Sequence, residues 1–177
     1  MTRHPNARTV AFADDGFVND TLQSALHIWA ELRHAFKEDA DVMMQLTKCT
    51  LLVQGVASLQ EARQKVRECM DADPALHSLR EIFDKEKGKD VIQVEGIKCV
   101  GVPIGTPEFV HNFVADKASK ILADVEKVQV VSDPLIHFHL LFFRQNTLLG
   151  YLSRNVPPSV MVNARRQFAR ALIVIGA

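Results

Sequence analysis

VAFADDGFV, residues 10–18, places two adjacent carboxylates, Asp14 and Asp15, in an otherwise apolar run near the start of the chain. Like charges repel each other, and burying either one in a strand would cost free energy. Strand-forming residues on both sides of Asp-Asp-Gly predict a β-hairpin over residues 9–18, with its tip at or beside the carboxylates. Such a pair is typical either of a plain turn or of a site for a divalent metal.

The composition is typical of a soluble globular protein. Of the 177 residues, 47% are hydrophobic and 24% are charged, which suits one domain or a small domain with an added helical part. Lys+Arg and Asp+Glu both number 21, so no overall positive charge indicates nucleic-acid binding. Any such binding must be local or must involve sequence outside this chain.

Neither a signal peptide nor a membrane span is expected. The first residues lack an apolar core, and no later apolar run is long enough to span a bilayer. The spacing of Cys49, Cys69 and Cys99 fits neither a disulfide framework nor a zinc site. We therefore expect an intracellular protein, cytoplasmic or nuclear, with no membrane partner.

Hydrophobic periodicity predicts an amphipathic helix over residues 21–38, with Asp20 as its cap. Residues 42–53 have two short apolar runs broken near Lys48, which predicts a strand. Ser58 followed by Glu61 is a capping box that opens a second helix.

A shorter helix is expected from Pro74, and residues 91–105 return to β character. Long helical patterns then fill the rest of the chain. Their ranges are 108–128, 134–154 and 157–175. The aromatic residues of the second range are most simply explained as core residues, namely Phe138, Phe142, Phe143 and Tyr151. The sequence thus predicts an α+β fold with a boundary near Gly105, mixed in residues 1–105 and all-helical in residues 106–177.

An aromatic residue, a small residue and two aspartates after a strand, FADD at residues 12–15, resemble the catalytic hairpin of reverse transcriptases. In that family, especially in non-LTR retroelements, the hairpin precedes an amphipathic helix, a strand with a lysine, a hairpin that grips the primer and a helical thumb. This chain has the same order. The resemblance implies a partial palm-like antiparallel sheet with packed helices, followed by a thumb-like helical bundle.

The resemblance also implies roles for individual residues. Asp14 and Asp15 would bind Mg²⁺ or Mn²⁺ for nucleotidyl transfer, and Phe12 would lie beside the primer end. Lys48 would neutralise or protonate the leaving pyrophosphate, although it is equally well explained as a solvated lysine at a strand end.

The grip-like hairpin would be residues 95–105, where Val100 and Gly101 stand in place of the more usual Leu-Gly and would lie close to the primer. Arg165 and Arg166 form a basic edge on the last predicted helix. That edge would contact a nucleic-acid backbone in a thumb, and otherwise is a solvated helix face.

One departure from the family concerns the catalytic acids. Reverse transcriptases have a further metal-binding aspartate well upstream, whereas the thirteen residues before Asp14 include no acid. The resemblance therefore implies a fragment that is inactive alone, with a separate N-terminal polymerase half, and an RNA template and DNA primer as partners of the complete protein. The alternative is a degenerate, non-enzymatic remnant that binds a protein through its apolar end, residues 171–177.

Overall fold

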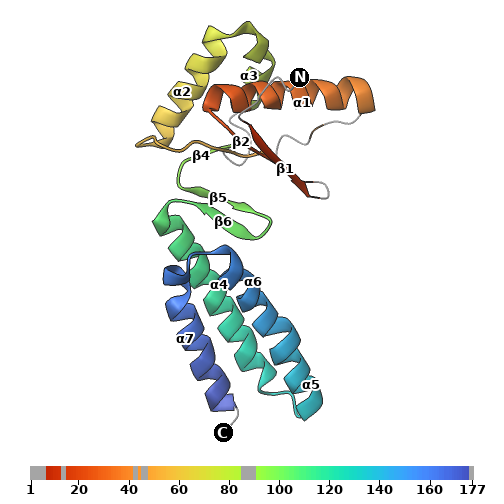
Figure 1. The fold of residues 1–177 in the computed structure, drawn as a ribbon, viewed down its shortest axis with the longest axis vertical. Coiled ribbons are helices and arrows are strands. Elements are labelled where there is room, and N and C mark those ends of the chain that lie inside the picture. Colours follow the sequence, from red (N-terminus) through yellow and green to blue (C-terminus); the bar gives the residue numbers. More distant parts are fainter. Residues whose placement is uncertain (1–6, 13–14, 42–43, 45–47, 85–90, 176–177) are drawn as a thin grey trace. The chain divides into compact units, whose positions relative to one another are not determined.

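The computed structural model describes residues 7–12, 15–41, 44, 48–84 and 91–175. The chain forms two compact units, Met1–Val94 and Glu95–Ala177. Both contain helices and strands (Figure 1), so the predicted α+β class is confirmed. None of the helices described is long and apolar enough to cross a lipid bilayer.

The first unit begins with the predicted hairpin, which is confirmed. Strands β1 (Arg8–Phe12) and β2 (Asp15–Asn19) pair antiparallel from Arg8 opposite Asn19 to Phe12 opposite Asp15. Helix α1 (Leu22–Ala40) follows as expected.

The N-cap of α1 differs from the prediction, because Thr21 occupies the cap position and its hydroxyl accepts a hydrogen bond from the Ser24 N–H. Asp20 instead accepts hydrogen bonds from the Thr21 N–H and the Ser24 hydroxyl. The Asp20 carboxylate therefore stabilises the start of α1 from the position before the N-cap.

Residues 42–43 and 45–47 of the predicted strand lie outside the described residues. Among the described residues of that range, strand β3 covers Leu51–Leu52 and pairs in parallel with β4 (Ile92–Gln93). Parallel strands need a long crossover connection, and here the chain between them forms helix α2 (Leu59–Ala72), the 3₁₀ helix η2 (Pro74–Leu79) and helix α3 (Arg80–Asp84). One of the three described strand pairs is therefore parallel, and the other two are antiparallel.

The predicted cap at the start of α2 is confirmed, with Ser58 at the N-cap, but the reciprocal bond to Glu61 comes from the residue before the cap. The Ser58 hydroxyl accepts a hydrogen bond from the Glu61 N–H at 3.1 Å, and the Glu61 carboxylate accepts one from the Ala57 N–H at 2.7 Å. The Ala57 N–H and the nearby Lys65 lower the pKa of Glu61. These bonds fix where α2 begins, and the spacing of Ala62, Val66 and Met70 decides which of its faces meets the core.

The core of the first unit is built from one face each of α1, α2 and η2, together with β3 and β4. Leu26 is completely buried, as are Val66, Leu76 and Leu79. Cys69 packs at the edge of this cluster, and burial raises the pKa of its thiol.

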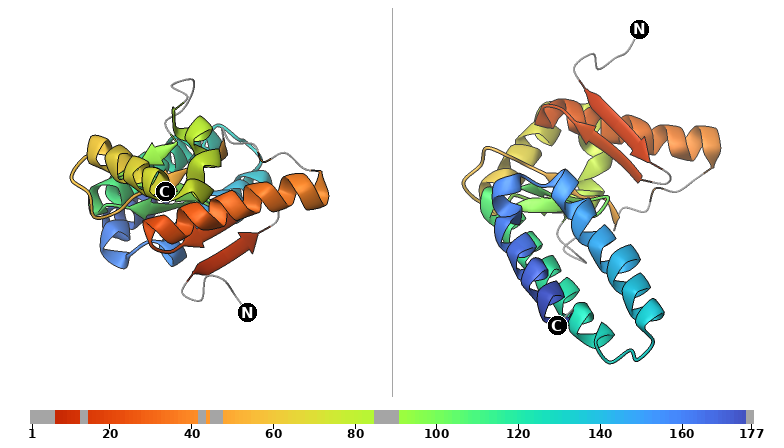
Figure 2. Two further views of the ribbon diagram at one scale, coloured as in Figure 1. Left: turned by 90° about the horizontal axis from the view of Figure 1, so that it is seen from above. Right: turned by 60° about the horizontal axis from the view of Figure 1, so that its bottom comes forward.

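The second unit begins with a hairpin of β5 (Gly96–Cys99) and β6 (Val102–Gly105). Its helices are α4 (Pro107–Val128), α5 (Pro134–His139), the π-helical segment η3 (Leu140–Gln145), α6 (Asn146–Asn155) and α7 (Pro158–Ile175). Helices α4, α6 and α7 run side by side (Figure 2) around a core that includes Val125, Leu152 and Met161.

The division between the units lies after Val94, whereas the sequence predicted a boundary near Gly105. The physical reason is that the β5–β6 hairpin packs on α4. A side chain at Gly96 would meet the Phe109 ring at 2.3 Å, and the Thr106 N–H donates to the Glu95 carbonyl at 2.7 Å. The hairpin therefore belongs with the helices that follow it.

Candidate functional site

The β1–β2 hairpin places Asp15 at its closed end. Phe12 is the last residue of β1 and lies opposite Asp15, the first residue of β2. Asp14 lies outside the described residues, and for Phe12 and Asp15 the structure describes the backbone. Val10 opposite Phe17 is typical of a β-ribbon, because β-branched and aromatic residues favour strands.

Lys48 does not lie in a strand. It is exposed and precedes β3 by three residues, so the prediction of a lysine within a strand is wrong. The leaving-group role of Lys48 stays a prediction.

The tip of the β5–β6 hairpin has an unusual backbone. Cys99 pairs with Val102, and the two residues between them have positive φ, 47° at Val100 and 82° at Gly101. A type I′ turn needs this geometry, which suits glycine but is rare for a β-branched residue. A residue held in such a region costs about 1–3 kcal/mol, so the surrounding structure must enforce it.

Tyr151 of α6 supplies that support. Its hydroxyl donates a hydrogen bond to the Val100 carbonyl at 2.5 Å. Its ring lies 3.5 Å from the position that a side chain at Gly101 would take. The sequence predicted Tyr151 as a core residue, which is wrong, because the residue is 41% exposed. The sequence carried no signal for its bond to Val100, because that contact joins residues 51 positions apart.

The predicted basic edge lies on α7, where Arg165 and Arg166 are exposed. The Arg165 Nε donates to the Ser153 hydroxyl at 3.2 Å and so ties α7 to α6. Arg165 thus has a structural partner within the helical bundle, and both guanidinium groups remain accessible to solvent.

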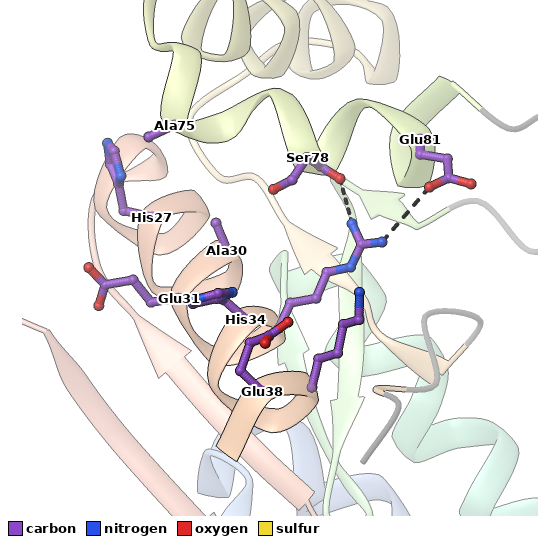
Figure 3. A pocket seen from close by; sticks show the side chains of 10 residues that line it. His27, Ala30, Glu31, His34, Glu38, Ala75, Ser78 and Glu81 are labelled. Atoms are coloured by element: carbon purple, nitrogen blue, oxygen red, sulfur yellow. Dashed lines mark hydrogen bonds and ion pairs between the residues drawn. The ribbon is translucent and has the colours of Figure 1, made fainter. Parts of the chain in front are cut away.

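The first unit has a hollow of about 560 Å³ between α1 and η2 (Figure 3). Arg33 reaches across it, donating to the Ser78 carbonyl at 2.5 Å and lying 3.8 Å from the Glu81 carboxylate. The lining carries charges of both signs, including Glu31 and Lys37. The hydrogen bond from Arg33 thus bridges α1 and η2.

In the described part of the chain, no group of three or more His, Cys, Asp or Glu side chains could hold a metal ion. The side chains of Asp14 and Asp15 lie outside that part. Comparison of the chain with protein-family models, with curated proteins and with solved structures found no match. The function therefore has to be inferred from the chain's own residues.

Proposed function

We propose that the chain is the C-terminal palm and thumb part of a retroelement reverse transcriptase. The observation that supports this most directly is the β1–β2 hairpin, whose register sets Phe12 opposite Asp15 and leaves the FADD motif at the closed end. In its complete form the protein would extend a DNA primer on an RNA template. In that protein, the strands and packed helices of the first part would form part of the palm, and the helical bundle of the second part would form the thumb.

The chemistry of the aspartate pair fits a divalent metal. Two carboxylates offer the hard oxygen ligands that Mg²⁺ and Mn²⁺ prefer. A bound pair of such ions would stabilise the attacking and leaving oxygens of nucleotidyl transfer. Asp14 and Asp15 would hold the ions, and adjacent positions at a hairpin end would keep their carboxylates close together.

The second unit supports nucleic-acid contact in two places. The Val100–Gly101 tip presents a short backbone turn held in position by Tyr151, as a primer-gripping hairpin requires. Arg165 and Arg166 present exposed positive charge on α7, and guanidinium groups pair readily with phosphates. Contact of the Val100–Gly101 turn with a primer, and of the two arginines with phosphates, is thus part of the proposed function.

The metal proposal predicts that Mn²⁺ binds weakly at the hairpin, with a dissociation constant on the order of 10⁻³ M, because two carboxylates form an incomplete site. In NMR spectra of the full chain, paramagnetic Mn²⁺ should broaden the amide signals of Ala11, Gly16 and Phe17. Asp14→Asn and Asp15→Asn should each weaken this broadening at least about threefold, because each removes one of two charged ligands.

Asp41→Asn is the matched control. Asp41 is an exposed acid with φ 50° at the end of α1, a conformation that asparagine tolerates, and its substitution should leave the broadening unchanged. Hairpin signals that stay sharp up to about 10 mM Mn²⁺ would count against a metal site at the aspartate pair.

The chain alone is predicted to be inactive as a polymerase, since the residues before Asp14 supply no further acid. Adding primer, template, nucleotides and Mg²⁺ to the purified chain should give no extension. Extension that Asp14→Asn abolishes would contradict this prediction. The proposal further expects the coding sequence upstream of this chain to encode a strand with another aspartate.

A second candidate function is a non-enzymatic module that binds proteins. The sequence assigned this role to the apolar end, but the side chains of residues 172–177 lie outside the described part. The observation that favours it is a different surface, the exposed apolar side of α5 and η3. Absence of an upstream aspartate-bearing strand would favour this function over the polymerase.

A further inference from the structure

The helix of residues 134–155 contains a turn that is wider than α-helical. Segment η3, which is π-helical, joins α5 to α6 without a break (Figure 1). The Asn146 N–H donates to the carbonyl of Leu141, five residues back, whereas in an α-helix it would donate to that of Phe142. One extra residue in a turn changes the direction of every side chain before it by about 100°, the angle of one α-helical residue. The π-helical turn therefore decides which side of α5 meets the core.

The inner side of this segment carries two polar side chains whose buried atoms lack a partner. Gln145 is 1% exposed, and its Oε1 atom accepts no hydrogen bond from the described residues. The Nε2 atom of His137 is also buried and has no hydrogen-bond partner among them. Leu141, between the two, packs against the core cluster of α4, α6 and α7. A buried polar atom without a partner costs free energy, so His137 and Gln145 oppose the burial of this side.

The outer side is apolar. Leu135 is 65% exposed, Phe138 55% and Phe142 50%, and we call these three residues the apolar stripe. The rings of Phe138 and Phe142 stack with their centroids 5.5 Å apart, which shields only part of each ring from water. Helices at a protein surface usually turn apolar side chains inward and polar ones outward. The observed orientation of α5 is the reverse of that arrangement.

An unbroken α-helix would turn the apolar stripe inward. Leu149 of α6 is buried in the core of the second unit. Alternating steps of four and three residues back from Leu149 follow one face of an α-helix, and they lead to Gln145, Phe142, Phe138 and Leu135. In the structure the inner side instead follows steps of four, through Gln145, Leu141 and His137. The two patterns separate at η3, where the extra residue lies.

We propose that residues 133–145 change between two helical registers, the observed π register and an α register that is turned by about 100°. In the α register the Asn146 N–H donates to the Phe142 carbonyl, and the apolar stripe turns toward the core. His137 turns toward water, which supplies its missing hydrogen-bond partner. The change therefore sets how much apolar surface the second unit exposes. This inference does not rest on the proposed function.

Little packing opposes this rotation. No residue of α5 is buried, and the Asp133 carboxylate accepts its hydrogen bonds from N–H groups of α5 itself, so the cap turns with the helix. The π register keeps Leu141 against the core and Arg144 3.9 Å from the Asp124 carboxylate of α4. The α register gains the burial of the apolar stripe and the hydration of His137. These gains and losses offset each other, which brings the two registers close in free energy.

Relaxation-dispersion NMR of the full chain, without metal or nucleic acid, tests the proposal. Helix register shifts take microseconds to milliseconds, and we expect a minor state of on the order of 1–10% at the amides of residues 134–146. Phe142→Gln should lower its population about tenfold or more, because the α register would then bury an amide without a partner. Circular dichroism should show unchanged helix content, since Phe142 is half exposed in the π register. Wild-type amides that show no dispersion overturn the proposal.

Phe143→Gln is the matched control. Phe143 is 62% exposed, and its position 100° from Phe142 keeps it on the outer side in both registers. The substitution should leave the minor population unchanged. A minor state that survives Phe142→Gln, or that Phe143→Gln removes equally, overturns the proposal.

His137→Leu tests the two registers from the inner side. It removes the unpartnered Nε2 atom and adds an apolar side chain to the side that is buried in the π register. The minor population should fall about threefold or more, and the midpoint of urea unfolding should rise. Phe142→Gln should lower the population without raising that midpoint. A minor population that stays the same or grows in His137→Leu contradicts the proposed rotation.

Discussion

Gly105→Ala is expected to destabilise the second unit by about 3 kcal/mol, at the upper end of the usual cost of inserting a methyl group into packed structure. A Cβ at this position would lie 2.2 Å from the Glu95 carbonyl oxygen and 2.4 Å from the Gly96 Cα. Both are backbone atoms and cannot rotate away. The first pair of the β5–β6 ladder would have to separate, together with the Thr106–Glu95 hydrogen bond that leads into α4.

Urea unfolding of the full chain, with hydrogen exchange at the β5 and β6 amides, measures this effect. Gly150→Ala is the control: Gly150 lies within α6, where a Cβ meets nothing within 4 Å. Alanine there should stabilise the helix by about 0.5–1 kcal/mol. Replacing glycine with alanine should thus lower the free energy of unfolding at position 105 and raise it at position 150. Equal effects at the two positions would show that the close approach at Gly105 does not exist in solution.

Leu26→Ala is expected to lower the free energy of unfolding of the first unit by about 2–5 kcal/mol, the usual range when a buried leucine leaves a cavity. Leu26 is 0% exposed in a cluster that also contains Val66, Met70 and Leu76. The second unit has a core cluster of its own. Hydrogen exchange should therefore speed up in α1 and α2, while α4 and α7 keep their protection.

Leu32→Ala provides the comparison on the same helix. Leu32 is 40% exposed, and its truncation should cost less than about 1 kcal/mol, as is usual near the surface. If Leu26→Ala accelerated exchange equally in both units, the two cores would have to unfold together, contrary to the division after Val94.

Local signals were enough to predict most of the secondary structure. The Ser58–Glu61 box, Pro74 and Pro107 mark helix starts through bonds and dihedral limits between near neighbours in the chain. The β1–β2 hairpin is equally local, with partners from Arg8 to Asn19. The hairpin that carries Asp14 and Asp15 could therefore be predicted from the sequence, although their role as metal ligands stays a proposal.

The sequence carried no local signal for contacts between residues that are far apart in the chain. The parallel pairing of β3 with β4, and the Tyr151 hydroxyl that holds the Val100 turn, join segments far apart in the sequence. Periodicity identified residues 134–154 as an apolar helix, and the prediction that its aromatic residues belong to the core is wrong. Which side of that helix meets the core depends on the packing of α4, α6 and α7, and only the tertiary structure shows that Phe138, Phe142 and Phe143 remain in water.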